Sequence, residues 1–381
     1  EDMIPYSRQW IDKNDIQEVV KVLKSPFITQ GPKIKEFEEV LTRYCGAKYA
    51  VSFSSGTAAL HAAYSVADIH AGDEVITSPL TFAATANMLV AVGAVPVFAD
   101  IDFATGNLDS REAEKKITKK TKAVVGVDYA GLPVDVSAFK KIAKKHKLVF
   151  IEDAAHALGA SHGKKKVGAL ADMTMFSFHP LKSITTGEGG AIVTNNKKYY
   201  EKLILFRSHG ITKDKKKLIN KKNPVWYHEM QDLGLNYRIT DIQATLGASQ
   251  MKKLDFFMEK RRAIALRYQQ EFKDLKNFII PKTFLGSESS WHLFALRLIP
   301  NKKHLRDFCF AELQKAGIGV QVHYIPVYRH PYYEALGYKK GLCPNAELFS
   351  ESEISIPIFP ALPSKEQSII IKVIQKIDRI L

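Results

Sequence analysis

The stretch Ser177-Phe178-His179-Pro180-Leu181-Lys182 is the starting point for predicting the fold of this chain. It overlaps an apolar run, Met173 to Phe178, that predicts a buried strand, and Lys182 follows where that strand ends. A second apolar run, Leu148 to Asp153, ends on a carboxylate. In open α/β sheets, ligands bind beyond the carboxyl ends of neighbouring strands. We therefore expect Lys182 and Asp153 to lie together in a site.

A lysine and an aspartate in this arrangement suit pyridoxal 5'-phosphate (PLP). This cofactor needs a lysine amine for its Schiff base, and an acid beside its ring nitrogen helps the ring to act as an electron sink. A lysine after an apolar strand is more often a solvated strand end, so the assignment depends on the other motifs.

Strand and helix patterns alternate between residues 35 and 200, which predicts an α/β fold with a large, mostly parallel sheet covered by helices. Residues 1–250 are predicted to form this large domain, together with an N-terminal substrate segment. Residues 251–381 are predicted to form a smaller α+β domain. The expected helices span 34–44, 58–67, 82–92, 136–146, 254–272 and 304–316, and the expected strands span 49–53, 74–77, 95–99, 123–127, 148–151, 173–178, 292–298 and 320–324.

A phosphate-binding turn is predicted between the first strand and the helix that follows it. Ser54-Ser55-Gly56-Thr57 lies there, and a helix start offers free N–H groups and a positive dipole end. Gly56 would let the backbone approach an anion closely. The hydroxyl of Ser177 could add a hydrogen bond. Taken alone, the turn also fits an ordinary capped helix, and Ser177 fits a polar strand residue.

Two further side chains could contact a flat cofactor ring. Phe82 follows a turn, where its ring could stack on the cofactor. His156 lies one turn past Asp153 and could bond to a ring oxygen. A core aromatic residue and a satisfied core histidine are the ordinary alternatives for these two positions.

Composition limits the class of protein. The 381 residues are 46% hydrophobic and contain no apolar run of about 18 residues, so we expect no membrane span. The N-terminal stretch lacks the pattern of a signal peptide. Cys45, Cys309 and Cys343 lack the spacing of metal ligands and are expected to be reduced thiols in a cytoplasmic protein, with no metal site.

The net charge of +15 invites a nucleic-acid interpretation, but the lysines are scattered among 40 acidic residues. No zinc-finger spacing, RNA-binding motif or helix-turn-helix pattern is present, so we expect no nucleic-acid partner. The densest basic run, Lys213 to Lys222, holds six lysines and predicts a surface loop. A patch for an anionic partner is the alternative.

Five motifs occur in an order that resembles a known family. They are Ser54-Ser55-Gly56-Thr57-Ala58-Ala59-Leu60, Glu152-Asp153-Ala154-Ala155-His156, Ser177-Phe178-His179-Pro180-Leu181-Lys182, Thr186-Gly187-Glu188-Gly189-Gly190 and Asn236-Tyr237-Arg238. Together they resemble the nucleotide-sugar aminotransferases of the DegT/DnrJ/EryC1/StrS family, and the match covers nearly the whole chain. The resemblance implies the type I PLP-dependent aminotransferase fold and a homodimer with shared active sites.

The resemblance also implies roles for the cofactor residues. Lys182 would form the Schiff base, and Asp153 would pair with the pyridinium. Gly56, Thr57 and Ser177 would hold the phosphate, helped by Asn236 from the partner subunit, while Phe82 would stack on the ring and His156 would contact its phenolic oxygen.

Three segments are most similar to one branch of the family: Val127–Gly131, Arg207–Gly210 and Val320–Pro326. That branch acts in pseudaminic acid biosynthesis. The similarity implies transfer of an amino group from L-glutamate to C4 of a UDP-linked 4-keto-6-deoxy-N-acetylhexosamine, with the Lys213–Lys222 loop near the site. The implied substrate residues are Tyr6, Pro26, Phe27, Ile28, Thr29, Gly56, Ser177, Asn236, Gln321, Val322, His323 and Tyr324.

Other functions remain open at this point. Enzymes for 4-keto sugars of the bacillosamine, perosamine or aminoarabinose type share most of these motifs. A PLP-dependent sugar dehydratase is disfavoured by Lys182, because some members with that chemistry lack the lysine. A non-catalytic regulatory or nucleic-acid-binding protein draws only on the charge.

Overall fold

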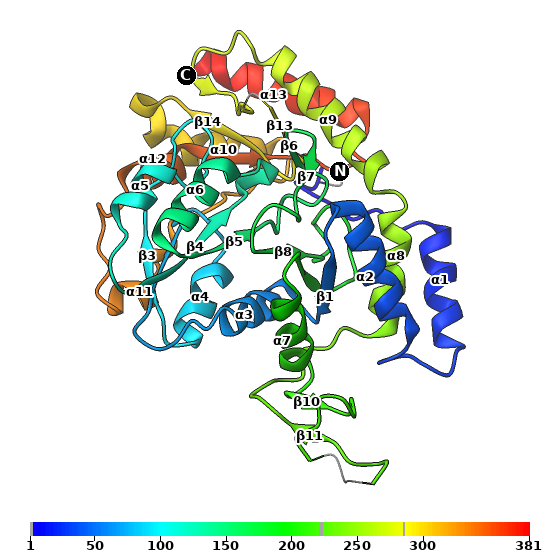
Figure 1. Cartoon of the computed structure of the whole chain (residues 1–381). Coiled ribbons are helices and arrows are strands. Elements are labelled where there is room, and N and C mark those ends of the chain that lie inside the picture. Colours follow the sequence, from blue (N-terminus) through cyan, green and yellow to red (C-terminus); the bar gives the residue numbers. More distant parts are fainter. Residues whose placement is uncertain (1–2, 221–223, 285) are drawn as a thin grey trace.

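The computed structural model describes residues 3–220, 224–284 and 286–381 (Figure 1). A seven-stranded sheet organises the larger part of the chain, with the strand order β1-β9-β8-β5-β4-β2-β3. All neighbouring pairs from β8 to β3 are parallel, and β9 runs antiparallel to both β1 and β8. The strands are β1 (Tyr49–Phe53), β2 (Glu74–Thr77), β3 (Val95–Phe98), β4 (Thr121–Val127), β5 (Val149–Asp153), β8 (Met173–Ser177) and β9 (Gly190–Thr194).

Helices cover both faces of this sheet, which explains why most residues of its strands are buried and many of them are apolar. Because alternate strand residues face opposite sides, Val125 of β4 packs in the cluster that includes α3, whereas Val124 packs in the cluster that includes α6. The helices of this part are α1 (Lys13–Leu23), α2 (Pro32–Cys45), α3 (Gly56–Val66), α4 (Ala84–Ala91), α5 (Ser110–Lys115), α6 (Val136–His146), α7 (Lys197–Arg207) and α8 (Asp241–Met251), with the short 3-10 helix η1 (Tyr129–Gly131).

A second, smaller sheet has the order β12-β14-β15 and belongs to a separate hydrophobic core. Its strands are β12 (Phe278–Ile279), β14 (Phe294–Leu298) and β15 (Glu353–Ile356), and its helices include α9 (Leu254–Glu271), α10 (Arg306–Lys315) and α13 (Ser364–Ile380). The remaining short elements are β6 (Ser161–His162), β7 (Lys165–Lys166), β13 (Ser287–Glu288), η2 (Pro300–Leu305), η3 (Val327–Arg329), α11 (Pro331–Ala335) and α12 (Pro344–Ser352).

The N-terminal segment joins this smaller unit through its backbone. Ile4 packs in the smaller core, its N–H donates to the carbonyl of Gly317, and the N–H of Ile358 donates to the carbonyl of Tyr6. These bonds hold the segment that contains Tyr6 against the smaller unit. The division at residue 250 stays a prediction.

The predicted α/β class with a mostly parallel sheet is confirmed. One element is wrong: residues 320–324 form no regular strand, and only Gln321 pairs, in an isolated bridge with Ser355. The N–H of His323 donates instead to the buried carboxylate of Glu353. A side chain that captures a backbone donor in this way competes with strand pairing.

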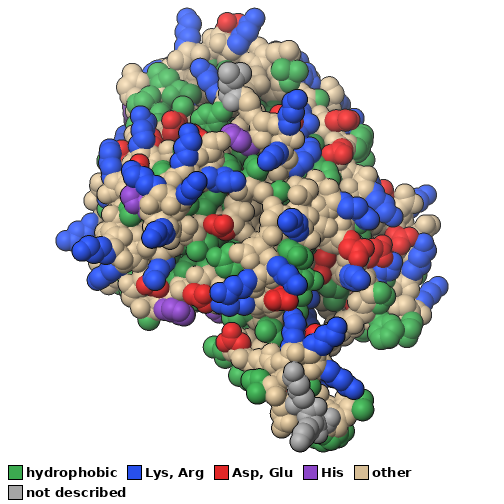
Figure 2. All heavy atoms as spheres, viewed as in Figure 1, with side chains coloured by type: hydrophobic (Ala, Val, Ile, Leu, Met, Phe, Trp, Pro, Cys, Tyr) green, Lys and Arg blue, Asp and Glu red, His purple; other side chains and the backbone are tan. Residues whose placement is uncertain are grey.

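An arm projects from the body below α7 in Figure 1, and the same arm extends from the bottom of the molecule in Figure 2. It contains the hairpin of β10 (Ile211–Thr212) and β11 (Glu229–Met230). Lys213 and Lys215–Lys217 are exposed, as predicted for a surface loop, whereas Lys221 and Lys222 lie outside the described residues. The arm also exposes large apolar side chains: Ile219, Val225, Trp226, Met230 and Leu233.

The three cysteines are buried and unpaired. In the parts of the chain that the structure describes, no helix has the length and apolarity needed to cross a bilayer. The same residues contain no cluster of three or more side chains suited to a metal ion.

Asp15 anchors α1 to α8, and α1 leads directly into the predicted substrate stretch. Its buried carboxylate accepts hydrogen bonds from Ser249 (2.6 Å), Gln250 (2.7 Å) and Lys253 (2.5 Å). We predict that Asp15→Ala lowers the free energy of unfolding by about 1–3 kcal/mol, because the buried donors Ser249 and Gln250 lose their shared acceptor. Urea denaturation measures this change.

Glu18→Ala on the same helix is the matched control. Among the residues that the structure describes, Glu18 forms an ion pair only with the exposed Lys21, so its loss should change the free energy of unfolding by less than about 0.5 kcal/mol. Equal urea midpoints for the Asp15 and Glu18 variants would contradict the anchoring role.

Candidate active site

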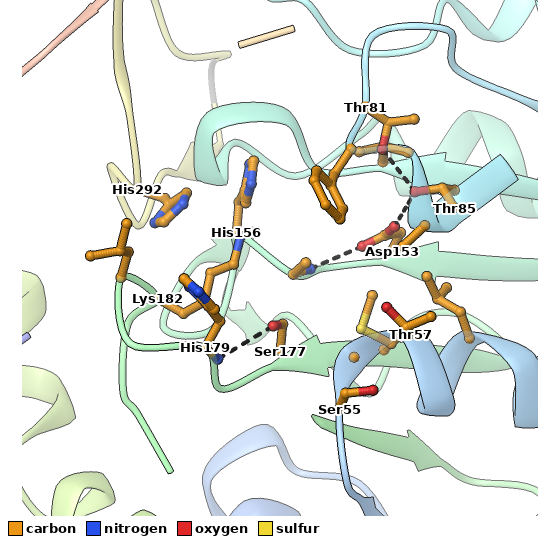
Figure 3. Close-up of a pocket in the computed structure, with 18 of the residues that line it drawn as sticks. Ser55, Thr57, Thr81, Thr85, Asp153, His156, Ser177, His179, Lys182 and His292 are labelled. Carbon is orange, nitrogen blue, oxygen red and sulfur yellow. Dashed lines mark hydrogen bonds between the residues drawn. The ribbon is translucent and has the colours of Figure 1, made fainter. Parts of the chain in front are cut away.

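A cavity of about 490 Å³ opens at the carboxyl ends of β5 and β8, beside the first turn of α3 (Figure 3). Parallel neighbours end at the same edge of the sheet, so residues far apart in the sequence meet there. The cavity brings together ten of the predicted site residues: Tyr6, Gly56, Thr57, Phe82, Asp153, His156, Ser177, Lys182, His323 and Tyr324.

Other predicted site residues do not line this cavity, as far as the described residues show. They are Pro26, Phe27, Ile28, Thr29, Asn236, Gln321 and Val322. Phe27 and Ile28 are 54% and 50% exposed, and Asn236 is exposed in a bridge with Ser208. Their roles stay predictions, and for Asn236 a position outside the cavity of its own chain fits the role predicted for it in the partner subunit.

Asp153 ends β5 and is buried at the base of the cavity. Its Oδ2 accepts from the Thr85 hydroxyl at 2.7 Å, and Thr85 is in turn bonded to Thr81 at 2.8 Å. Burial raises the pKa of this carboxyl, while the bonds from Thr85 and Ala155 and the charge of Lys182 act in the opposite direction. The carboxylate is held in one orientation but would be more stable beside a further positive charge.

Lys182 follows β8, is partly buried and enters the same cavity (Figure 3). Burial lowers the pKa of its amine from 10.5 to about 8, although Asp153 raises it, and Arg261 lowers it further. A desolvated lysine is a stronger nucleophile at neutral pH because more of it is uncharged. Lys182 is therefore prepared for covalent chemistry.

Two histidines lie next to each other beside Lys182, with their ring centroids 4.2 Å apart and their ring planes tilted by 36°. Burial lowers the pKa of both His156 and His292 well below the usual value, so both rings are neutral. Nε2 of His156 is 3.0 Å from the hydroxyl of Tyr324. Since that hydroxyl keeps its proton, it can donate to Nε2, which leaves Nδ1 of His156 as a buried N–H.

The first turn of α3 forms a cup beside β8. Ser55 caps the helix by accepting from the N–H of Ala58, and the N–H groups of Gly56 and Thr57 remain at the helix start. A Cβ on Gly56 would lie 3.3 Å from Oγ of Ser177, so glycine brings the cup and that hydroxyl together. Gly190 passes beneath, where a Cβ would lie 2.7 Å from the nitrogen of Gly56. This close packing shapes a site for an anion.

Among the cavity residues that were not predicted as site residues from the sequence are Thr81, Thr85, His292 and Glu188. Thr81 and Thr85 are four residues apart, but only the hydrogen bond from Thr85 to the end of β5 shows that they orient Asp153. His292 comes from the smaller unit, so no local pattern connects it with His156.

Comparisons with known proteins agree with this geometry. Residues 9–375 match the DegT/DnrJ/EryC1/StrS aminotransferase family. The chain is 42% identical over 367 residues to the UDP-4-amino-4,6-dideoxy-N-acetyl-beta-L-altrosamine transaminase of Campylobacter jejuni, which covers 96% of this chain and 94% of the relative.

Two solved structures extend the likeness to the fold. Helicobacter pylori PseC, an aminotransferase involved in the biosynthesis of pseudoaminic acid, superposes with a TM-score of 0.94 at 39% identity over the full length of both chains. The PLP form of Spr1654 from Streptococcus pneumoniae, described only as a candidate sugar aminotransferase, superposes with a TM-score of 0.92 at 31% identity over 99% of both chains.

The fold and the cavity thus define an aminotransferase. More particularly, the chain belongs to the DegT/DnrJ/EryC1/StrS aminotransferase family. The predicted aminotransferase fold, the predicted transaminase activity and PLP as the predicted cofactor are confirmed.

The cavity residues fit PLP in three respects. Asp153 is a buried carboxyl whose pKa is raised, so a protonated ring nitrogen would compensate its charge. Nδ1 of His156 is buried and has no hydrogen-bond partner within the described parts of the chain, so it could donate to a ring oxygen. Phe82 lines the cavity with 64% of its surface exposed, which leaves a flat apolar face for a ring.

We predict that apoenzyme reacts with PLP at a rate that rises through about pH 8 and then levels off, because only the neutral amine of Lys182 attacks. In Asp153→Asn the midpoint should fall, since the lost carboxylate no longer stabilises the ammonium form. The growth of cofactor absorbance after rapid mixing measures both rates. A midpoint near the ordinary lysine value of 10.5 would contradict the desolvated amine.

Proposed function

We propose that this enzyme transfers the amino group of L-glutamate to C4 of a UDP-linked 4-keto-6-deoxy-N-acetylhexosamine, giving UDP-4-amino-4,6-dideoxy-N-acetyl-β-L-altrosamine for pseudaminic acid biosynthesis. The meeting of Lys182 and Asp153 in one cavity carries the transamination. The choice of sugar is supported by the 42% identity to the altrosamine transaminase of Campylobacter jejuni.

Bound PLP would supply an electron sink for the bond changes at the amino-bearing carbon. Asp153 would keep the ring nitrogen protonated, and Thr85 would hold that carboxylate in place. The amine of Lys182, once free, would move a proton between C4' of the cofactor and C4 of the sugar. The α3 cup and Ser177 would bind the phosphate, and Phe82 would cover one face of the ring.

The sugar would bind on the side of the cavity formed by Tyr6, His323 and Tyr324. These side chains offer hydrogen-bonding groups beside the apolar ring of Phe82. A sugar of the wrong configuration would leave such a buried group unpaired, at a cost of roughly 1–3 kcal/mol. The excess of basic residues would favour a substrate that carries a diphosphate.

The active enzyme is proposed to be a cytoplasmic homodimer in which each subunit completes the other's site. Asn236 is exposed and lies outside its own cavity, which suits a residue that serves a partner. The projecting arm exposes apolar side chains such as Val225 and Trp226, which are 89% and 74% exposed. Large exposed apolar groups of this kind often mark a protein interface.

The assay that tests this function supplies L-glutamate with a panel of UDP- and dTDP-linked 4-keto sugars. We expect turnover of UDP-2-acetamido-2,6-dideoxy-β-L-arabino-hexos-4-ulose with a kcat/KM about tenfold or more above that of its D-xylo epimer. Equal values for the two epimers would refute the sugar assignment. Absence of amino transfer from glutamate to any sugar in the panel would refute the proposed reaction.

Asp153→Asn should retain some cofactor but lose orders of magnitude in kcat, because it keeps the shape and removes the charge. Asp172→Asn is the matched control: Asp172 accepts from the N–H of Phe150 near the opposite end of β5, away from the cavity. Steady-state assays with glutamate compare the two. An unchanged kcat in Asp153→Asn would show that Asp153 only terminates its strand.

Shared sites can be tested by mixing inactive subunits. Lys182→Ala and Asn236→Ala homodimers should each be impaired, whereas a mixed dimer would contain one site with both residues intact. We expect activity to return after subunit exchange, to about half of the wild-type value per mixed dimer. Exchange verified by mass spectrometry without recovery would mean that each site is built from one chain.

A further inference from the structure

A buried acid, a hydroxyl and an imidazole form a chain of hydrogen bonds that ends at the cavity. Glu353 and Ser355 lie on β15 and are fully buried, and His323 lines the cavity. Oε1 of Glu353 is 2.5 Å from Oγ of Ser355, and that oxygen is 2.8 Å from Nδ1 of His323. The family resemblance implied His323 as a substrate residue but offered no link to the two residues behind it.

The position of the His323 backbone is held from both sides. Its N–H donates to Oε2 of Glu353 at 2.8 Å, and its carbonyl accepts from the hydroxyl of Tyr129 at 2.5 Å. The ring Nε2 has no hydrogen-bond partner among the residues that the structure describes. Neutral imidazole carries one proton, so the bond at Nδ1 determines whether Nε2 is an acceptor or a donor.

Two arrangements satisfy every bond in this chain. If Glu353 is ionised, the Ser355 hydroxyl donates to it and accepts from Nδ1–H, which leaves Nε2 as an acceptor. If Glu353 is protonated, it donates to Ser355, whose hydroxyl then donates to Nδ1, so the ring proton sits on Nε2. Only protons move between the two arrangements, and no heavy atom needs to shift.

We propose that Glu353, acting through Ser355, sets which ring nitrogen of His323 carries the proton, and so whether His323 offers the bound sugar an acceptor or a donor. The role toward the sugar rests on the function proposed above. Glu353 and Ser355 are positioning residues, since neither reaches the cavity itself.

The surroundings of Glu353 and His323 allow the change between the two hydrogen-bond arrangements to occur near neutral pH. Burial raises the pKa of Glu353 to about 8, against the bonds from Ser355 and His323 and the charges of Arg306 and Arg297. Burial lowers the pKa of His323 to about 4, so the ring stays neutral while Glu353 titrates. The groups that face this chain are Arg297 from β14, Arg306 from α10, Tyr129 from η1, Tyr324 beside His323, and Lys182, Tyr6, His156 and His292 around the cavity.

The consequence for recognition depends on the chemistry of the sugar group. An amide N–H can only donate, so it pairs with His323 only when Glu353 is ionised. A carbonyl oxygen can only accept and pairs only in the opposite arrangement, whereas a hydroxyl can pair in both. The pH dependence of binding would therefore identify the group that contacts His323.

We call the chain from Glu353 through Ser355 to His323 the relay. Nitrogen NMR of the histidine rings tests it in the holoenzyme without any substrate. The histidines are labelled with nitrogen-15, and the signal of His323 is identified by its absence in His323→Gln. We expect the ring proton of His323 on Nε2 at about pH 6.5 and on Nδ1 at about pH 9.5. In Glu353→Gln the amide donates to Ser355 at every pH, so the proton should stay on Nε2. In Ser355→Ala, the change of the His323 tautomer that accompanies the titration of Glu353 should disappear.

Ser352→Ala is the matched control. Ser352 is also buried, but its hydroxyl donates to the carbonyls of Leu348 and Phe349 and has no link to His323, so its spectra should follow the wild type. Unperturbed signals of the other histidines would show that each variant is folded. The relay would be wrong if His323 kept one tautomer across this pH range in the wild type, or if Glu353→Gln left the tautomer change in place.

Binding of the UDP-sugar gives the second readout. If the sugar group that contacts His323 can only donate or only accept, the affinity of the wild type for the UDP-sugar should differ about tenfold between about pH 6.5 and about pH 9.5. This difference is counted after subtracting the change that Glu353→Gln shows over the same range. Identical pH dependence in both proteins would show that no such group contacts His323, and would overturn the role toward the sugar. A failed tautomer test with intact glutamate transamination would refute the relay alone, whereas absent transamination would refute the proposed function.

Discussion

The charge interaction between the amine of Lys182 and the carboxylate of Asp153, which line the same cavity, is the one on which the active site depends. Each group is costly to bury alone, and each shifts the pKa of the other toward the charged form. Burial nevertheless has the larger effect on the pKa of both groups. The pKa of the lysine therefore falls to about 8, and that of the aspartate rises. The result is a nucleophile that loses its proton readily and a carboxylate that favours a cationic ring beside it.

The parallel sheet makes this interaction possible. Because β5 and β8 run side by side in the same direction, Asp153 and the end of β8 reach the same edge. The turn before α3 reaches that edge too, since β1 lies parallel to β8 across the antiparallel β9. Gly190 at the start of β9 then allows the α3 cup to pack directly on the strand, which places an anion site beside the two charged residues.

The sequence could predict those parts of the site that lie at strand ends or helix starts, because their position follows from local periodicity. Lys182, Asp153, Gly56 and Ser177 are of this kind, and the structure brings them to one cavity. Thr85, His292 and Glu353 could not be predicted. Thr85 and His292 line the cavity only because elements far apart in the chain pack together, and Glu353 lies behind His323 without lining the cavity. The strand expected at residues 320–324 is absent for a similar reason. Its pattern is local, but the backbone N–H of His323 donates to the side chain of the distant Glu353.

The central claim is that Lys182, among the many lysines of this chain, bonds covalently to PLP. Reduction of the PLP-loaded protein with borohydride, followed by proteolysis and mass spectrometry, identifies the modified residue. The account predicts one pyridoxyl group per chain, on the peptide that contains Lys182. Labelling of an exposed lysine in its place, or stable cofactor binding with no labelled peptide, would contradict it.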